Sequence, residues 1–176
     1  EKLFGRAMVG NLVVLARSVV PADVQEALWA LLGWCCALDP RRIAAAGLAP
    51  LTLAGYLGPR VSVLRTCLQR VLMRASRDPT EALPVVLRAL DFVHSAVVHQ
   101  PALVYTLLAQ SGEGATSTAK TCAQTLVELL CACSRADGDA FTHAHLALAD
   151  RVLGVLLAMR ERKGTLGVAA TALERC

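Results

Sequence analysis

Two closely spaced pairs of metal-binding residue types are the first feature of this 176-residue sequence that could do chemistry. Cys131-Ala132-Cys133 is followed by His143-Ala144-His145, and thiolate and imidazole are common ligands of zinc. Side chains two positions apart on a helix point about 200° away from each other, so neither pair can chelate an ion from one face of an unbroken helix. The spacing therefore favours core cysteines and surface histidines, and we expect no metal and no cofactor.

The other residues with catalytic side chains form no recognisable catalytic pattern. His94 and His99 are five positions apart, whereas histidines that share a metal on one helix stand at i and i+4, as in HExxH. The segment Ser111-Gly112-Glu113-Gly114 follows no predicted strand, so we interpret it as a connection between helices and not as a phosphate-binding loop. Nothing local distinguishes any cysteine and histidine as a nucleophilic pair. The sequence predicts no catalytic residue and no enzyme activity.

The cysteines have the setting of small core residues. Their number is odd, and they stand among Leu, Val and Ala at helical spacing: Cys35, Cys36, Cys67, Cys122, Cys131, Cys133 and Cys176. Such cysteines are typical of proteins in a reducing compartment. We predict that all are reduced and that Cys35, Cys67 and Cys122, or their immediate helix neighbours, face the core.

A basic helix is the candidate for contact with a partner. Its arginines recur at intervals of five, five, four and three: Arg60, Arg65, Arg70, Arg74 and Arg77. The last three share one side of a helix, whereas the first two turn to other sides. Two interpretations stay open, a solvated face and a contact with an acidic or phosphate-bearing partner. The net charge of +4 is spread along the chain, so a nucleic acid partner is not indicated.

The elements that must position these residues are helices throughout. Hydrophobic residues make up 55% and aromatic residues 4%, and the apolar residues recur three and four apart, which favours an all-α fold with more than about 65% helix. Charges interrupt the apolar runs, so no transmembrane segment is expected. Prolines and glycines divide the pattern into helices expected over 5–19, 22–38, 40–47, 50–57, 60–76, 80–99, 101–110, 115–136, 139–162 and 164–175.

Prolines mark where these helices are expected to start, because a first-turn residue needs no N–H and proline already has a helical φ. The prolines assigned to first turns are Pro21, Pro40, Pro59, Pro79 and Pro101. Asp39 and Asp78 precede two of them, and we expect each to cap the helix that follows. Pro84 falls about one turn into its helix, where it costs little.

A weak internal repeat indicates how the helices are organised. Ala37-Leu38-Asp39-Pro40 and Ser76-Arg77-Asp78-Pro79 both end a long helix, about 39 residues apart, and His99-Gln100-Pro101 does so about 22 residues later. The first spacing is close to that of HEAT and armadillo repeats. We therefore predict an α-solenoid of irregular HEAT/armadillo-like helix pairs, with residues 1–176 as one segment of a longer chain. Its apolar ends are expected at Leu3-Phe4 and at Leu166, Val168 and Leu173.

From about Pro79 onward the order of features resembles the large inner-ring scaffold nucleoporins, the giant α-solenoids of the nuclear pore complex. Residues 90–103, LDFVHSAVVHQPAL, are similar to a family helix that ends in Gln-Pro and is followed by a short Leu-rich helix. A polar loop from Gln110 to Thr118 and helices like 122–130 and 145–157 follow. The resemblance implies a non-enzymatic scaffold at the nuclear envelope whose grooves receive segments of linker nucleoporins.

Two other functions fit the same helical pattern. One is a karyopherin-like or other HEAT-repeat adaptor, and the other is a helical accessory region of a larger enzyme. Both share the architecture predicted above, so the residues alone leave them open. In each case the partners are other proteins, with no small-molecule substrate in this segment.

Overall fold

The computed structural model describes residues 6–18, 20–38, 52–109, 120–135, 142–162, 167, 168 and 170 of the chain. Helix makes up 87% of the structure, and no strand occurs among the residues that it describes. The predicted all-α class is therefore confirmed. No described helix combines the length and the apolar composition that a membrane crossing requires.

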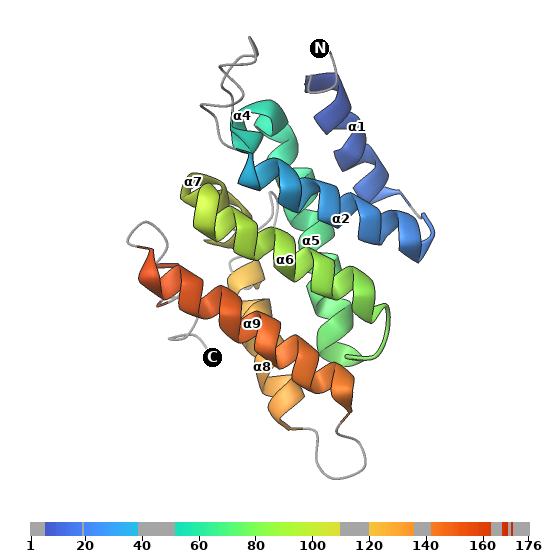
Figure 1. Cartoon of the computed structure of the whole chain (residues 1–176), viewed down its shortest axis with the longest axis vertical. Coiled ribbons are helices and arrows are strands. Elements are labelled where there is room, and N and C mark those ends of the chain that lie inside the picture. Colours follow the sequence, from blue (N-terminus) through green and yellow to red (C-terminus); the bar gives the residue numbers. More distant parts are fainter. Residues whose placement is uncertain are drawn as a thin grey trace.

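The long helices lie in two layers (Figure 1). The helices of one layer run in the same direction and pack side by side in chain order: α2 (Ala22–Ala37), α6 (Leu83–His99) and α9 (His143–Glu161). The other layer packs in the same order: α1 (Arg6–Arg17), α5 (Val61–Arg77) and α8 (Cys122–Ser134). Each helix also contacts its chain neighbour across the layers, so the described helices form successive pairs α1/α2, α5/α6 and α8/α9.

Short elements join the long helices. α4 (Leu53–Leu57) and the 3₁₀ turn η1 (Gly58–Arg60) precede α5. α7 (Pro101–Val104) follows α6 and continues as the π-helical turn η2 (Tyr105–Ala109). The sequence predicted one helix over 101–110, and the structure divides it into these two parts.

The contact between α2 and α6 is the most extensive one between described helices. Trp29 and Phe92 are both fully buried, and their ring centroids lie 5.5 Å apart. Gly33 lies against the backbone of α6, because a Cβ at this position would stand 3.4 Å from the Cα atom of Phe92. A residue without a side chain thus brings the two helices close together, and the large rings fill the space beside it.

Ion pairs cross this layer from one pair of helices to the next. The Arg88 guanidinium on α6 lies 3.3 Å from the Glu26 carboxylate on α2 and 3.5 Å from Asp91 on its own helix. Asp91 is in turn 3.4 Å from Arg151 on α9. Exposed pairs of this kind contribute only about 0–1 kcal/mol each. Their main effect is to favour one relative position of α2, α6 and α9.

The start of α6 differs from the predicted start of the helix over 80–99. Asp78 does not cap this helix, because its Oδ1 accepts hydrogen bonds from the N–H and hydroxyl of Thr80 and so closes a turn. Pro79 belongs to that turn, and Ala82 precedes the helix with a left-handed φ of 51°. Pro84 occupies the first helical turn instead. A proline does stand in the first turn of α6 as expected, but it is Pro84 and not Pro79.

Side-chain caps fix the starts of the last two long helices. Thr121 and Gln124 form a capping box at the start of α8, with Thr121 N–H donating to Gln124 Oε1 at 2.8 Å. At the start of α9 the Thr142 N–H donates to Nδ1 of His145 at 3.1 Å. Both helices consequently begin later than the predicted 115–136 and 139–162, since these threonines are extended and not helical.

Several predictions from the sequence concern residues outside the described ranges. These are the helix over 40–47, the caps and starts at Asp39 and Pro40, the connection Ser111–Gly114, most of the helix over 164–175, and the apolar ends at Leu3-Phe4, Leu166 and Leu173. The expectation for Val168 is wrong, because this residue is buried in the core and does not form an exposed apolar end. The 39-residue spacing is not the structural repeat, because it relates the end of α2 in one layer to the end of α5 in the other. Residues that pair between successive helices of one layer are 56 to 64 positions apart.

Replacing Gly33 tests the close approach of α2 and α6. We expect Gly33→Leu to lower the free energy of unfolding by about 1–3 kcal/mol, because the added side chain must push α6 away from α2. Gly154→Gln in α9 is the control, since no atom lies within 4 Å of a Cβ at Gly154 and a polar side chain does not add to the exposed apolar residues of α9. It should be neutral or raise stability by up to about 0.8 kcal/mol through helix propensity. Urea unfolding followed by circular dichroism measures both, and equal effects would contradict the packing at Gly33.

Candidate functional site

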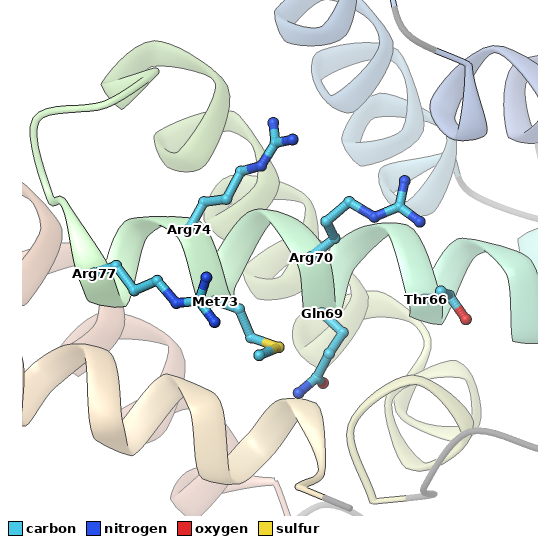
Figure 2. Close-up of a pocket in the computed structure, with 6 residues that line it drawn as sticks. All are labelled: Thr66, Gln69, Arg70, Met73, Arg74 and Arg77. Atoms are coloured by element: carbon cyan, nitrogen blue, oxygen red, sulfur yellow. The ribbon is translucent and has the colours of Figure 1, made fainter. Parts of the chain in front are cut away.

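An open groove of about 330 Å³ runs along the outer side of α5. Its lining residues follow the three-and-four spacing that places side chains on one face of a helix. They are Thr66, Gln69, Arg70, Met73, Arg74 and Arg77. Figure 2 shows Arg70 and Arg74 extending to one side of the helix, and Gln69 and Met73 to the other. We call this surface the arginine groove.

The arginines of the groove carry charge that the described residues do not neutralise. Arg70, Arg74 and Arg77 are exposed, and none of them forms an ion pair within the described ranges. The nearby charge of Arg17, at the end of α1, adds to the field. Burial raises the pKa of the Cys67 thiol, and the charges of Arg70 and Arg17 oppose that rise. Positive charge is thus concentrated where α1 and α5 meet.

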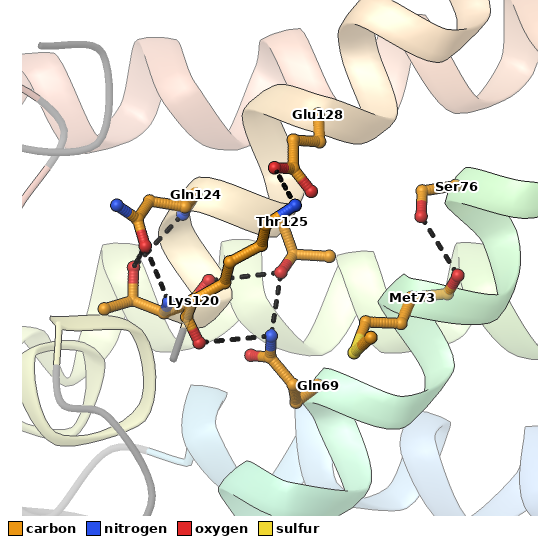
Figure 3. A network of polar contacts seen from close by, with 8 residues as sticks. Gln69, Met73, Ser76, Lys120, Gln124, Thr125 and Glu128 are labelled. Atoms are coloured by element: carbon orange, nitrogen blue, oxygen red, sulfur yellow. Dashed lines mark hydrogen bonds and ion pairs between the residues drawn. The ribbon is translucent and has the colours of Figure 1, made fainter. Parts of the chain in front are cut away.

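The polar end of the groove is held by α8 (Figure 3). Gln69 Nε2 donates to the Thr125 hydroxyl at 2.8 Å and to the carbonyl of Lys120 at 3.3 Å. Lys120 pairs with Glu128 at 2.6 Å, so the carboxylate nearest to this network is already engaged. Because Thr125 is fully buried, these hydrogen bonds fix α5 against α8 and with it one wall of the groove.

The two other arginines of the predicted basic helix do not line the groove and contact other elements of the fold instead. Arg60 belongs to η1, and its guanidinium lies where a Cβ on Gly10 of α1 would stand. Arg65 is buried and donates from NH1 to the carbonyl of Thr106 in η2 at 3.4 Å. The sequence placed 70, 74 and 77 on one side and the other two elsewhere, and the structure confirms this division. It did not foresee that Arg65 is buried.

In both the cysteine pair and the histidine pair, the two side chains lie on different sides of their helix, as a spacing of two residues requires. Cys133 is buried and Cys131 is exposed, while His145 is buried and His143 is exposed. The prediction of core cysteines is therefore wrong for Cys131, and that of surface histidines is wrong for His145, which caps α9. Within the described part of the chain no three His, Cys, Asp or Glu residues are grouped as ligands for a metal ion. His94 and His99 are both exposed.

Burial makes the described core cysteines poor nucleophiles, because the thiolate is the reactive form. It raises the pKa of Cys35 to about 11 and that of Cys122 to about 12. For Cys36 burial is again the main cause, with Cys35 adding to it, and the pKa is raised to about 12. Cys35, Cys67 and Cys122 face the core as predicted. Cys176 lies outside the described residues.

Most of the exposed large apolar side chains lie on the first and last helix pairs, although Met73 on α5 and Tyr105 in η2 are exposed as well. Those with roughly 40–60% exposure on α1 and α2 are Val14, Leu15, Val24 and Trp34. On α9 they are Leu146, Leu153 and Leu157, which lie on the side opposite to the buried residues of that helix. We call the surface formed by these three leucines the outer face of α9. On α6, which lies between α2 and α9, no large apolar residue is exposed.

The chain matches no protein-family model, and no curated protein or solved structure is significantly similar to it.

Thiol labelling tests the burial of the cysteines. In a Cys176→Ser background, native protein should react rapidly with a maleimide at one thiol, Cys131, because the other described cysteines are buried and protonated. Adding Cys131→Ser should abolish the rapid phase, whereas all remaining thiols react after denaturation. Mass spectrometry counts the labels. Rapid native labelling that survives the Cys131→Ser substitution would contradict the burial described above.

Proposed function

We propose that this chain is a non-enzymatic segment of an α-solenoid scaffold that binds other proteins through its helical surfaces. The observation that carries the proposal is the distribution of exposed apolar residues. α6 has neighbours on both sides and exposes no large apolar residue, whereas α2 and α9 each lack a described neighbour on one side and expose two and three such residues, respectively. Helices in a repeat array have this property, because each pair buries one face against the next.

The arrangement of the helix pairs also supports an array. Each described pair packs on the next with its helices in the same layer order and direction. The spacing of 56 to 64 residues exceeds the 40–47 residues of HEAT and armadillo repeats. Short elements such as α4 and η1 lengthen the repeat, so we propose irregular helix pairs with inserted turns.

Energetics favour covering the outer face of α9. Fully burying a leucine is worth about 1.5–3 kcal/mol, so three half-exposed leucines represent on the order of 2–4 kcal/mol of burial not realised. We propose that a following helix pair of the parent chain realises it. Gly154, where a Cβ has no neighbour within 4 Å, leaves room for close approach of that helix, as Gly33 does for α6.

The chemistry of the described side chains supports a binding role without catalysis. Burial keeps the thiols of Cys35, Cys36 and Cys122 protonated. His145 is a helix cap, and His94 and His99 are exposed on α6. The described side chains do form one charged surface, the arginine groove, and we propose that this surface binds another protein.

For the cellular setting we propose the inner-ring scaffold of the nuclear pore complex. The support is the resemblance of residues 90–103, 122–130 and 145–157 to that family. In this chain α6 ends at His99, the short α7 starts at Pro101, and α8 and α9 follow, which is the helix order that we expect of this family. A karyopherin-like adaptor is the competing function.

The end-face proposal predicts self-association of residues 1–176 in isolation. We expect the chain to form oligomers or aggregates, because its exposed apolar faces find each other when no further helix pair covers them. Leu153→Lys with Leu157→Lys should restore a monomer. His94→Lys with His99→Lys adds the same charge on α6 and is the matched control, which should self-associate like the unchanged chain. Light scattering coupled to size exclusion measures all three.

A contrary result in this experiment has a clear meaning. If the unchanged chain is a monomer with a high melting temperature, it is a self-contained helical domain and the array proposal is wrong. If both lysine variants become monomeric to the same extent, added charge and not the outer face of α9 controls association.

The setting at the nuclear pore predicts where the full parent protein is found in cells. Tagged at one end, it should give a punctate signal at the nuclear rim that recovers slowly after photobleaching, because scaffold subunits exchange little. Rapid recovery with signal in both nucleus and cytoplasm would instead support the karyopherin-like adaptor.

A further inference from the structure

Resting on the proposed protein-binding function, we propose that the arginine groove binds an acidic segment of a partner protein that places an apolar side chain between its carboxylates. The groove offers three guanidinium groups, from Arg70, Arg74 and Arg77, and one exposed thioether, Met73, within the same stripe. Guanidinium groups bind carboxylates through paired N–H donors, which gives the contact direction as well as charge.

The helix dipole accounts for two of these three arginines without a partner. Arg74 and Arg77 lie in the last turn of α5, where positive charge complements the helix dipole without a partner. Arg70 stands about two turns from the end, where this effect has faded. Like charges at i and i+4 repel each other, so Arg70 and Arg74 disfavour the free helix slightly. A carboxylate bound between them removes that repulsion.

Carboxylates of the same chain do not fill this role within the described ranges. Glu26 and Asp91 pair with Arg88, and Asp91 also with Arg151, on the layer of α2, α6 and α9. Glu128 pairs with Lys120 beside the groove. Asp78, just beyond the end of α5, accepts hydrogen bonds from Thr80, which are the main cause of its lowered pKa. The charge of the groove is therefore available to an acidic partner.

The spacing of the groove defines the partner. Along a helix the rise is about 1.5 Å per residue, so Arg70 and Arg74 are separated by about 6 Å and Arg70 and Arg77 by about 10 Å. A partner helix with acidic residues at i, i+4 and i+7 and an apolar residue among them matches this pattern. Single-stranded nucleic acid is bound through aromatic stacking surfaces, and no aromatic residue lines this groove. A protein segment is the better match.

Fluorescence anisotropy with the full chain tests the proposal. The probe is a fluorescein-labelled peptide with glutamates at i, i+4 and i+7 around a leucine, compared with a peptide of equal composition whose glutamates are clustered at one end. We expect Arg74→Glu to weaken binding of the first peptide at least about tenfold, by removing one attraction and adding a repulsion. Arg160→Glu is the matched control, since Arg160 is also exposed in the last turn of a helix. It should change Kd less than about twofold.

Further arms separate the competing partners. Met73→Gln keeps the charge and should weaken the first peptide about threefold or more, with no effect on the clustered peptide. An oligothymidine of equal charge should bind more weakly than the first peptide. Tighter binding of the oligothymidine, equal effects of Arg74→Glu and Arg160→Glu, or no peptide binding at low ionic strength would each overturn the proposal. Self-association through the outer face of α9 is measured separately, so a failure here is distinguishable from a failure of the scaffold proposal.

Discussion

The close contact of α2 with α6 at Gly33 is the constraint on which the remaining arrangement depends. Without a side chain at this position the two backbones come together, and Trp29 and Phe92 fill the space beside it. This places α6 so that Arg88 meets Glu26 on one side and Asp91 meets Arg151 on the other. The position of α9, and with it the position of its partner α8 beside α5, follows from where α6 lies.

The two layers differ in how their charges are satisfied. The layer of α2, α6 and α9 pairs its acidic and basic side chains with each other across successive helices. The layer of α1, α5 and α8 is held instead by neutral hydrogen bonds from Gln69 to Thr125 and Lys120. Arg70, Arg74 and Arg77 on α5 form no ion pair with the described residues. The charged side chains of the first layer therefore hold its successive helices together. In the second layer we propose that the arginines of the groove bind another molecule.

The sequence predicts the helices well because apolar spacing and proline placement act locally. It misplaced the start of α6 because two prolines, Pro79 and Pro84, could each stand in the first turn. The turn that Asp78 closes with Thr80 contains Pro79 and leaves the first helical turn to Pro84. The capping patterns Thr121-x-x-Gln124 and Thr142-x-x-His145 were present in the sequence and would have placed two other starts correctly. The stripe of Arg70, Arg74 and Arg77 was predictable from periodicity. The burial of Arg65 was not, because it depends on the carbonyl of Thr106, 41 positions away.

Packing between successive pairs also has a consequence for how the chain folds. Each described pair finds its main contacts in the pair before or after it, so the loops that must close between the described helices are of similar, moderate length. We expect the α2–α6 unit to form first, because it buries the largest aromatic residues. Ordered structure then spreads from it toward both ends, as in a one-dimensional chain of coupled units.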